Sequence, residues 1–208
     1  MPKPTLIFAA LACCALLLAG VASQPNSAVA QPEAPEGVDW IIPQVERYDA
    51  EMLAQRQNIT PMEAATMLAR QPAIGELRAK LVARDDDNFA GLWVTGTSPE
   101  TQRVMVAFKD NLDAELALLR ADFPYPELLQ GVAAARSYSE LRALYQQTID
   151  QRNSLAAADA RRIDIMIDEP ANEIKIYAPA DLLATLEAMV ADASAIKVIE
   201  AQHESADD

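Results

Sequence analysis

The chain has 208 residues and is strongly acidic, with 17 Lys and Arg against 31 Asp and Glu. This excess of negative charge argues against binding to nucleic acid or anionic membrane surfaces, which attract proteins rich in Lys and Arg. Its only cysteines are Cys13 and Cys14, and its one histidine is His203. These counts exclude a disulfide framework and a histidine-based catalytic or metal centre, so we expect no enzyme activity, catalytic residue, metal site or cofactor.

Residues 1–30 have the layout of a secretory signal peptide. Lys3 precedes an apolar run from Leu6 to Ala22, and Ala28-Val29-Ala30 places small residues at positions −3 and −1 of a cleavage site. We expect a secreted or periplasmic protein cleaved after Ala30, with cleavage after Ser23 as a second possibility. The apolar run is nearly long enough to span a bilayer, so an N-terminal membrane anchor is the alternative. Residues 31–208 hold 16 basic and 31 acidic residues, a net charge of −15.

Residues 31–86 are expected to form a flexible lead-in and a helical hairpin. The lead-in, residues 31–44, is rich in Pro and acidic residues. Within residues 45–86, Val45, Tyr48 and Met52 form an apolar stripe at helical spacing, and Thr60-Pro61-Met62-Glu63 is a capping box that begins a second helix. Pro72 is expected to kink or split this second helix.

Two later stretches, residues 88–136 and 161–202, resemble each other. Each has two strand-like runs around a turn, then an amphipathic helix, then a third strand. The turn of the second stretch is Glu169-Pro170-Ala171-Asn172. The sequence therefore predicts an α+β fold with two ββαβ lobes after the helical hairpin. The corresponding positions are Val104 with Ile174 and Val106 with Ile176 at an offset of 70, and Leu92 with Ile163 and Val94 with Ile165 at an offset of 71.

Residues 137–160 are expected to form a long helix that joins the two lobes. Ser137-Tyr138-Ser139-Glu140 is a capping box at its start. The apolar spacing extends the helix to about Asp159, a length of roughly 33 Å at 1.5 Å per residue. Such a helix would act as a spacer between the lobes.

The strand sequence Phe89-Ala90-Gly91-Leu92-Trp93-Val94 carries a family resemblance, together with Arg103 to Phe108 and Ser137-Tyr138-Ser139. It resembles the pro-region of secreted chymotrypsin-like bacterial proteases of the alpha-lytic protease and streptogrisin type. The likeness covers about Tyr48 to Glu200. The alternative is an edge hairpin with a buried Trp. The residues that match the family motif are Phe89, Gly91, Trp93, Val104 and Val106.

The resemblance implies a folding chaperone and inhibitor that adds its sheet to a hairpin of the protease and lays its C-terminal tail in the substrate cleft. The matching elements here are the strand Ile196 to Ala201 and the tail Gln202 to Asp208, of which residues 203–208 are the acidic tail. Because the sequence ends at Asp208 without a protease motif, the implied partner is a separately encoded serine protease. The alternative is an envelope module that keeps the fold and binds another protein or peptide. The implied partner-binding residues are Ile196, Val198, Glu200, Gln202 and His203.

Clustered carboxylates offer two further hypotheses. The run Asp85-Asp86-Asp87-Asn88 could attract a cation, but it fails the EF-hand spacing, and we expect a solvated turn. Asp164, Asp168 and Glu169 could supply the acid and base of a hydrolase, our third hypothesis. Asp164 alternates with the apolar residues around it, however, and is therefore expected to face solvent.

Overall fold

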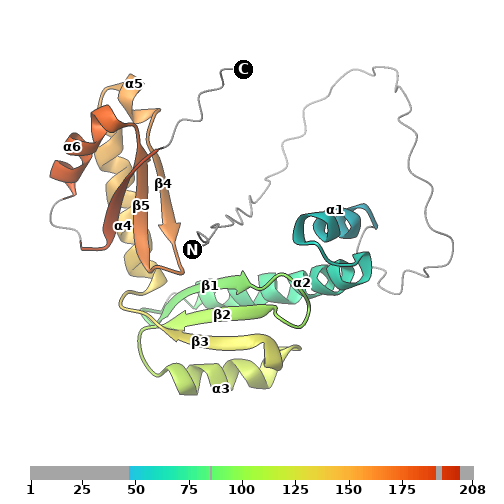
Figure 1. Cartoon of the computed structure of the whole chain (residues 1–208). Helices are drawn as coiled ribbons and strands as arrows, with labels where there is room; N and C mark the ends of the chain where they lie inside the picture. Colours follow the sequence, from blue (N-terminus) through green and yellow to red (C-terminus); the bar gives the residue numbers. More distant parts are fainter. Residues whose placement is uncertain (1–46, 85, 191–193, 202–208) are drawn as a thin grey trace, which may run out of the picture. The chain divides into compact units, whose positions relative to one another are not determined.

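The computed structural model describes residues 47–84, 86–190 and 194–201. It confirms the predicted α+β class, because these residues form six α-helices and two three-stranded sheets (Figure 1). The expected signal peptide, the lead-in and the acidic tail lie outside the described residues. The same holds for Val45, Gln202 and His203.

Helices α1 (Arg47–Gln57) and α2 (Pro61–Ala83) follow each other in the chain and pack together. The predicted capping box begins α2, because the Thr60 hydroxyl accepts a hydrogen bond from the Glu63 N–H while the Glu63 carboxylate accepts one from the Thr60 N–H. Tyr48 does not contribute to the contact between the two helices, since it is 68% exposed. The two helices instead meet through small side chains that allow close approach, namely Ala50, Ala54, Ala64 and Ala65.

Pro72 does not split α2, which runs without interruption from Pro61 to Ala83. The side chain of Pro72 is exposed, whereas Ile74, Leu77 and Leu81 form the buried face. A carbonyl that loses its N–H partner on the exposed side of a helix can be solvated. Packing of the buried face therefore stabilises the helix on both sides of the proline.

The first ββαβ unit contains β1 (Phe89–Thr95), β2 (Arg103–Phe108), α3 (Leu112–Asp122), the short 3₁₀ helix η1 (Pro126–Leu128) and β3 (Leu129–Ala133). The sheet order is β1-β2-β3, antiparallel between β1 and β2 and parallel between β2 and β3. One sheet face packs with α2 and α3, and it includes Leu92, Val104, Val106 and Leu129. Of the family-motif residues, Phe89, Val104 and Val106 are core residues, while Trp93 is half-buried on the edge strand β1.

The second ββαβ unit has the same element order: β4 (Asp164–Asp168), β5 (Glu173–Ala178), α6 (Ala180–Met189) and β6 (Ile196–Glu200). Its sheet order is β4-β5-β6, again with one antiparallel and one parallel pair. A separate core is built from the inner sheet face and α6, and it includes Ile163, Ile176, Ala178, Leu182 and Leu186. Asp164 is exposed, as predicted.

The correspondence predicted for the first strand of each unit is wrong by two residues. Leu92 pairs with Val106, whereas Ile165 pairs with Ile176. Since Val106 and Ile176 correspond, Leu92 corresponds to Ile165 at an offset of 73 rather than 71. The physical reason is the length of the turn, because residues 96–102 link β1 to β2 while only residues 169–172 link β4 to β5.

Helix α4 (Tyr138–Asn153) begins at the predicted capping box but ends earlier than expected. The Ser154 hydroxyl donates to the Gln151 carbonyl at 2.6 Å, and Leu155 turns into the second core. A separate single turn, α5 (Ala157–Ala160), follows. The 16 residues of α4 span about 24 Å, so the predicted extension to Asp159 is wrong.

Candidate functional site

The two sheets together have four edge strands, β1, β3, β4 and β6. An edge strand presents N–H and C=O groups that no neighbouring strand satisfies, and such groups can pair with a strand of another protein. The partners of these outward-facing groups therefore show which edges are closed and which remain available.

The β1 edge is closed at Leu92 by an ion pair. The main-chain groups of Leu92 point away from β2. Its N–H donates to Glu169 Oε2 at 2.7 Å, and its carbonyl accepts from Arg78 Nη1 at 2.7 Å. Arg78 and Glu169 also bind each other, with Nη1 to Oε2 at 2.9 Å. The two charged groups thus form the hydrogen bonds with the N–H and the carbonyl of Leu92 that a neighbouring strand would otherwise form.

Glu169 is largely shielded, with 14% of its side chain exposed against 35% for Arg78. The hydrogen bond from Arg78 to Glu169 raises the pKa of the guanidinium, and burial opposes this effect. The Arg78 guanidinium carbon also lies 5.6 Å from the centre of the Tyr138 ring, within cation–π range. The Glu169 carboxylate therefore acts as an anchor between α2, β1 and the β4–β5 turn.

Gly91 is required by the close approach of Glu169. A Cβ atom at residue 91 would lie 2.9 Å from both Cβ and Oε2 of Glu169, closer than real Cβ contacts come. The glycine of the family motif therefore makes room for the carboxylate that closes the β1 edge.

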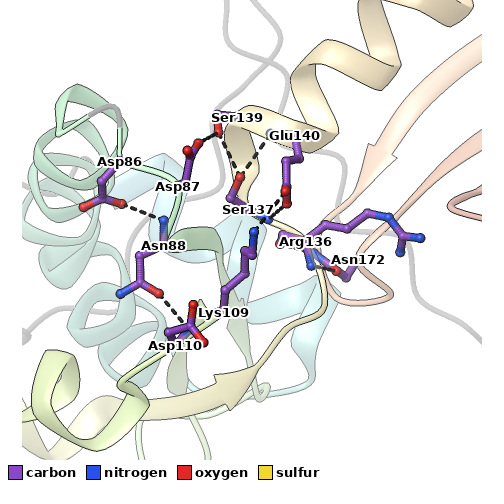
Figure 2. A network of polar contacts seen from close by, with 10 residues as sticks. All are labelled: Asp86, Asp87, Asn88, Lys109, Asp110, Arg136, Ser137, Ser139, Glu140 and Asn172. Atoms are coloured by element: carbon purple, nitrogen blue, oxygen red, sulfur yellow. Dashed lines mark hydrogen bonds and ion pairs between the residues drawn. The ribbon is translucent and has the colours of Figure 1, made fainter.

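The same turn makes a second polar contact with the start of the segment that leads into α4. The Arg136 N–H donates to Asn172 Oδ1 at 2.8 Å, and Asn172 Nδ2 donates to the Arg136 carbonyl at 2.9 Å (Figure 2). The Asn172 side chain thus pairs with both main-chain groups of Arg136. The turn can be identified from the sequence but neither contact can, because no local pattern links Glu169 to Arg78, 91 residues away.

The β3 edge is closed at one position. The outward carbonyl of Leu129 accepts a hydrogen bond from Arg120 Nη2 of α3 at 3.0 Å. The helix that follows β2 therefore supplies a cation to the edge of its own unit.

The β6 edge has no such partner within the described residues. The Ile174 N–H donates to Ala195 O at 2.7 Å, and the Ala201 N–H donates to Ala178 O at 2.8 Å. Main-chain groups of a strand alternate in direction, so residues 195, 197, 199 and 201 face β5. The N–H and C=O groups of Ile196, Val198 and Glu200 consequently point to the free edge.

These three residues are those that the sequence analysis assigned to partner binding. Ile196 and Val198 pack their side chains against the second core, and Glu200 is exposed. The edge therefore offers its main chain rather than these two apolar side chains. Figure 1 shows β6 on one side of β5 and β4 on the other.

The β4 edge is also unpaired within the described residues. Because Ile174 and Ile176 direct their main-chain groups to β6, the residues between them bond to β4, which leaves Ile165 and Ile167 facing outward. Helix α4 packs beside β4 and β5. The second sheet therefore has two available edges, of which β6 matches the strand implied by the family resemblance.

The acidic run before β1 has a structural role. Asp86 Oδ1 accepts from the N–H groups of Phe89 and Asn88 at 2.9 and 3.2 Å, and Asp87 Oδ1 accepts from the Ser139 hydroxyl at 2.8 Å (Figure 2). Burial raises the pKa of Asp86, but these N–H groups and Arg84 together lower it by more, so the net shift is downward. Across the part of the chain that the structure describes, no three potential metal ligands gather.

Of the three carboxylates considered for a hydrolase, two are bound to different cations and the third is exposed. Glu169 binds Arg78, Asp168 binds Lys175, and Asp164 is exposed. Among the described residues that line a hollow of about 440 Å³ between α2 and α4, Asp86 alone is acidic, and its carboxylate lies 2.7 Å from Arg84 Nε. The described lining therefore does not offer the paired carboxylates that acid–base hydrolysis requires.

No protein-family model matches the chain, and no curated protein shows significant sequence similarity to it. None of the described helices has the length and apolar character needed to cross a bilayer.

Proposed function

We propose that the chain is an exported, non-catalytic binding protein that joins its β6 edge to a strand of a protein partner. The partner class implied by the sequence resemblance is a secreted chymotrypsin-like serine protease, encoded separately. On this proposal the protein acts as its folding chaperone, its inhibitor or both. The observation that carries the proposal is the row of outward main-chain groups at Ile196, Val198 and Glu200.

The contrast with the two edges of the first sheet supports an edge of the second sheet, and the family resemblance selects β6 over β4. The β1 edge is closed at Leu92 and the β3 edge at Leu129, each by charged side chains. Proteins commonly protect edges that must not pair, so an unprotected edge of regular strand geometry is a candidate interface. An added strand would extend the sheet β4-β5-β6 and bond to the three outward residues of β6.

The finer arrangement belongs to the same proposal. A helical hairpin followed by two ββαβ lobes, with α4 as the connecting helix, would give a pro-region-like body that presents its last strand to the protease. We propose that the two lobes arose by duplication, supported by their shared element order and by sheets of the same topology.

Export and charge fit this role. A signal peptide ending at Ala30 would place the protein with secreted proteases. A net charge of −15 over residues 31–208 would speed its encounter with a basic partner in a salt-dependent manner.

The second candidate function is an envelope module that uses the same edge for a partner other than a protease. Main-chain pairing favours this candidate equally, because it depends little on the sequence of the incoming strand. Recovery of a non-protease partner whose binding requires the β6 edge would support it.

The test uses the full chain and a variant in which the edge is blocked. Val198→Pro removes an outward N–H while leaving the bonds between β5 and β6 in place, and Val198→Ala is the control for the lost side chain. The unmodified chain and the control should inhibit, or raise the refolding yield of, a chymotrypsin-like protease exported by the same cell. The proline variant should do neither. If the unmodified chain changes neither protease activity nor refolding yield, the protease proposal is wrong.

A further inference from the structure

We infer that the strand received by β6 carries an acidic residue opposite Lys197 and an apolar residue opposite Ile199. This inference rests on the proposed use of the β6 edge and adds the chemistry by which that edge selects its partner. It concerns the outer face of the second sheet, which lies opposite the core formed with α6.

Lys197 and Ile199 both lie on this outer face. Lys197 pairs with Lys175 of β5, and Ile199 pairs with Tyr177. Ile196 and Val198, which alternate with them, belong to the inner face and contact the core. Since side chains alternate along a strand, a partner strand would place every second side chain beside Lys197 and Ile199.

The hydrogen-bond pattern brings these side chains close to the partner. Lys197 and Ile199 direct their own main-chain groups to β5, so they would occupy non-hydrogen-bonded positions against an antiparallel strand. Side chains are nearest at such positions, with Cα atoms about 4.5 Å apart. The residues opposite Lys197 and Ile199 are therefore those that the edge can discriminate.

The charge at this position is unbalanced. Lys175 binds the carboxylate of Asp168 and lies 3.9 Å from Glu173, so it is already neutralised. Lys197 is exposed and has no ion pair or hydrogen bond within the described residues, although it stands beside Lys175. A carboxylate on the incoming strand would supply the missing counter-charge, whereas a cation would add a third positive side chain to the row.

The neighbouring row is apolar near the edge. Tyr177 and Ile199 are both half-buried and lie side by side on β5 and β6. An apolar side chain on the added strand would cover the outer flank of Ile199, while a charged one would lose hydration there.

A second copy of this chain fits the edge less well. Antiparallel pairing of two β6 strands about Val198 would place each Lys197 opposite an Ile199 of the other copy. Neither lysine would then gain a carboxylate. The charge at the edge thus favours a different protein with an acidic strand residue.

The experiment uses two blocked seven-residue peptides, Thr-Val-Thr-Glu-Thr-Val-Thr and the same peptide with Lys at its centre. A valine stands two residues before the central residue and another stands two residues after it. One of them therefore lies opposite Ile199 whether the peptide pairs with β6 in the parallel or the antiparallel direction. Affinities for the full chain are measured from amide chemical-shift changes of β6 residues. The Glu peptide should bind roughly 1.5- to 5-fold more tightly than the Lys peptide, the range expected for one cross-strand charge pair. Lys197→Glu should reverse this preference, and replacing both valines by serine should weaken binding.

The outcomes separate this inference from the proposed function. Equal binding of the two peptides by the unmodified chain and by Lys197→Glu would overturn the inference, while loss of that binding in Val198→Pro would still support the β6 edge. Shifts confined to β4, or no peptide binding, would overturn both. Concentration-dependent dimerisation that perturbs the β6 amides would also contradict the inference, because it would identify a second copy as the occupant.

Discussion

At the scale of single residues, Glu169 shows how a carboxylate in a turn can have a structural role. Its oxygens satisfy one main-chain donor and one guanidinium, and Gly91 leaves the space that this approach needs. Hydrogen bonds to charged groups contribute more than neutral ones, and a shielded partner left alone is unfavourable. The contact therefore should matter more than an exposed surface ion pair.

We predict that Glu169→Ala lowers the free energy of unfolding by about 1–3 kcal/mol, because the Leu92 N–H and the Arg78 guanidinium lose their acceptor. The amide of Leu92 should also exchange faster with solvent. Urea unfolding and amide hydrogen exchange measure the two effects. Glu173→Ala is a suitable control, since its nearest cation, Lys175, is 3.9 Å away. Equal Leu92 exchange rates in both variants would contradict the role assigned to Glu169.

At the scale of elements, local signals were sufficient where a local interaction determines the structure. The capping boxes at Thr60 and Ser137 were predicted correctly because residues three apart form them. The apolar residues around Val104 and Val106 likewise predicted a strand, and β2 runs from Arg103 to Phe108. Both signals can be found without knowledge of the neighbouring elements.

The errors arose where distant residues decide the outcome. Pro72 is tolerated because α2 buries the opposite face, and α4 ends early because Leu155 enters the second core. The edge residues of β6 were identified through the family resemblance. Their availability depends on hydrogen bonds between β5 and β6, which the sequence alone does not reveal.

The cap of α4 gives a prediction at this scale. Ser137 is fully buried, and its hydroxyl accepts from the Glu140 N–H at 3.1 Å. Ser137→Ala should lower the free energy of unfolding by about 1–2 kcal/mol, since the part-buried N–H of Glu140 loses its capping partner. Thr60→Ala removes the equivalent cap from an exposed site and should have a smaller effect, because water can replace the hydroxyl. Urea unfolding of both variants tests this order, and a larger loss for Thr60→Ala would contradict it.

At the scale of the whole molecule, 31 acidic residues make stability depend on pH in two opposing ways. Acidification reduces the net negative charge and with it the self-repulsion of the folded chain. It also protonates carboxylates that are bound to cations in the folded state. The second effect depends on which pKa values folding lowers.

Two such carboxylates belong to the first unit and its junction with α4. The paired hydrogen bonds from Arg84, at 2.9 and 3.0 Å, lower the pKa of Glu115 from its ordinary value of 4.5. Lys109, with Nζ 2.9 Å from the carboxylate, and the Ser137 N–H lower that of Glu140. A carboxylate whose pKa falls on folding stabilises the protein when the pH is above the pKa of that carboxylate in the unfolded chain. This contribution is lost as the pH drops through the pKa of the carboxylate in the folded protein.

We therefore predict that the free energy of unfolding, measured by urea titration from about pH 8 to about pH 3, declines once the pH falls below about 4.5. Moderate salt should raise stability near neutral pH by screening repulsion, yet it should leave the acid-side decline in place, because the close Arg84–Glu115 pair is screened less than distant charges. Glu115→Gln should be less stable than the unmodified chain at neutral pH and should lose less on acidification, since it has no proton to bind. Parallel pH curves for the two proteins would show that the Glu115 pair does not contribute to acid unfolding and would leave the remaining carboxylates as its cause.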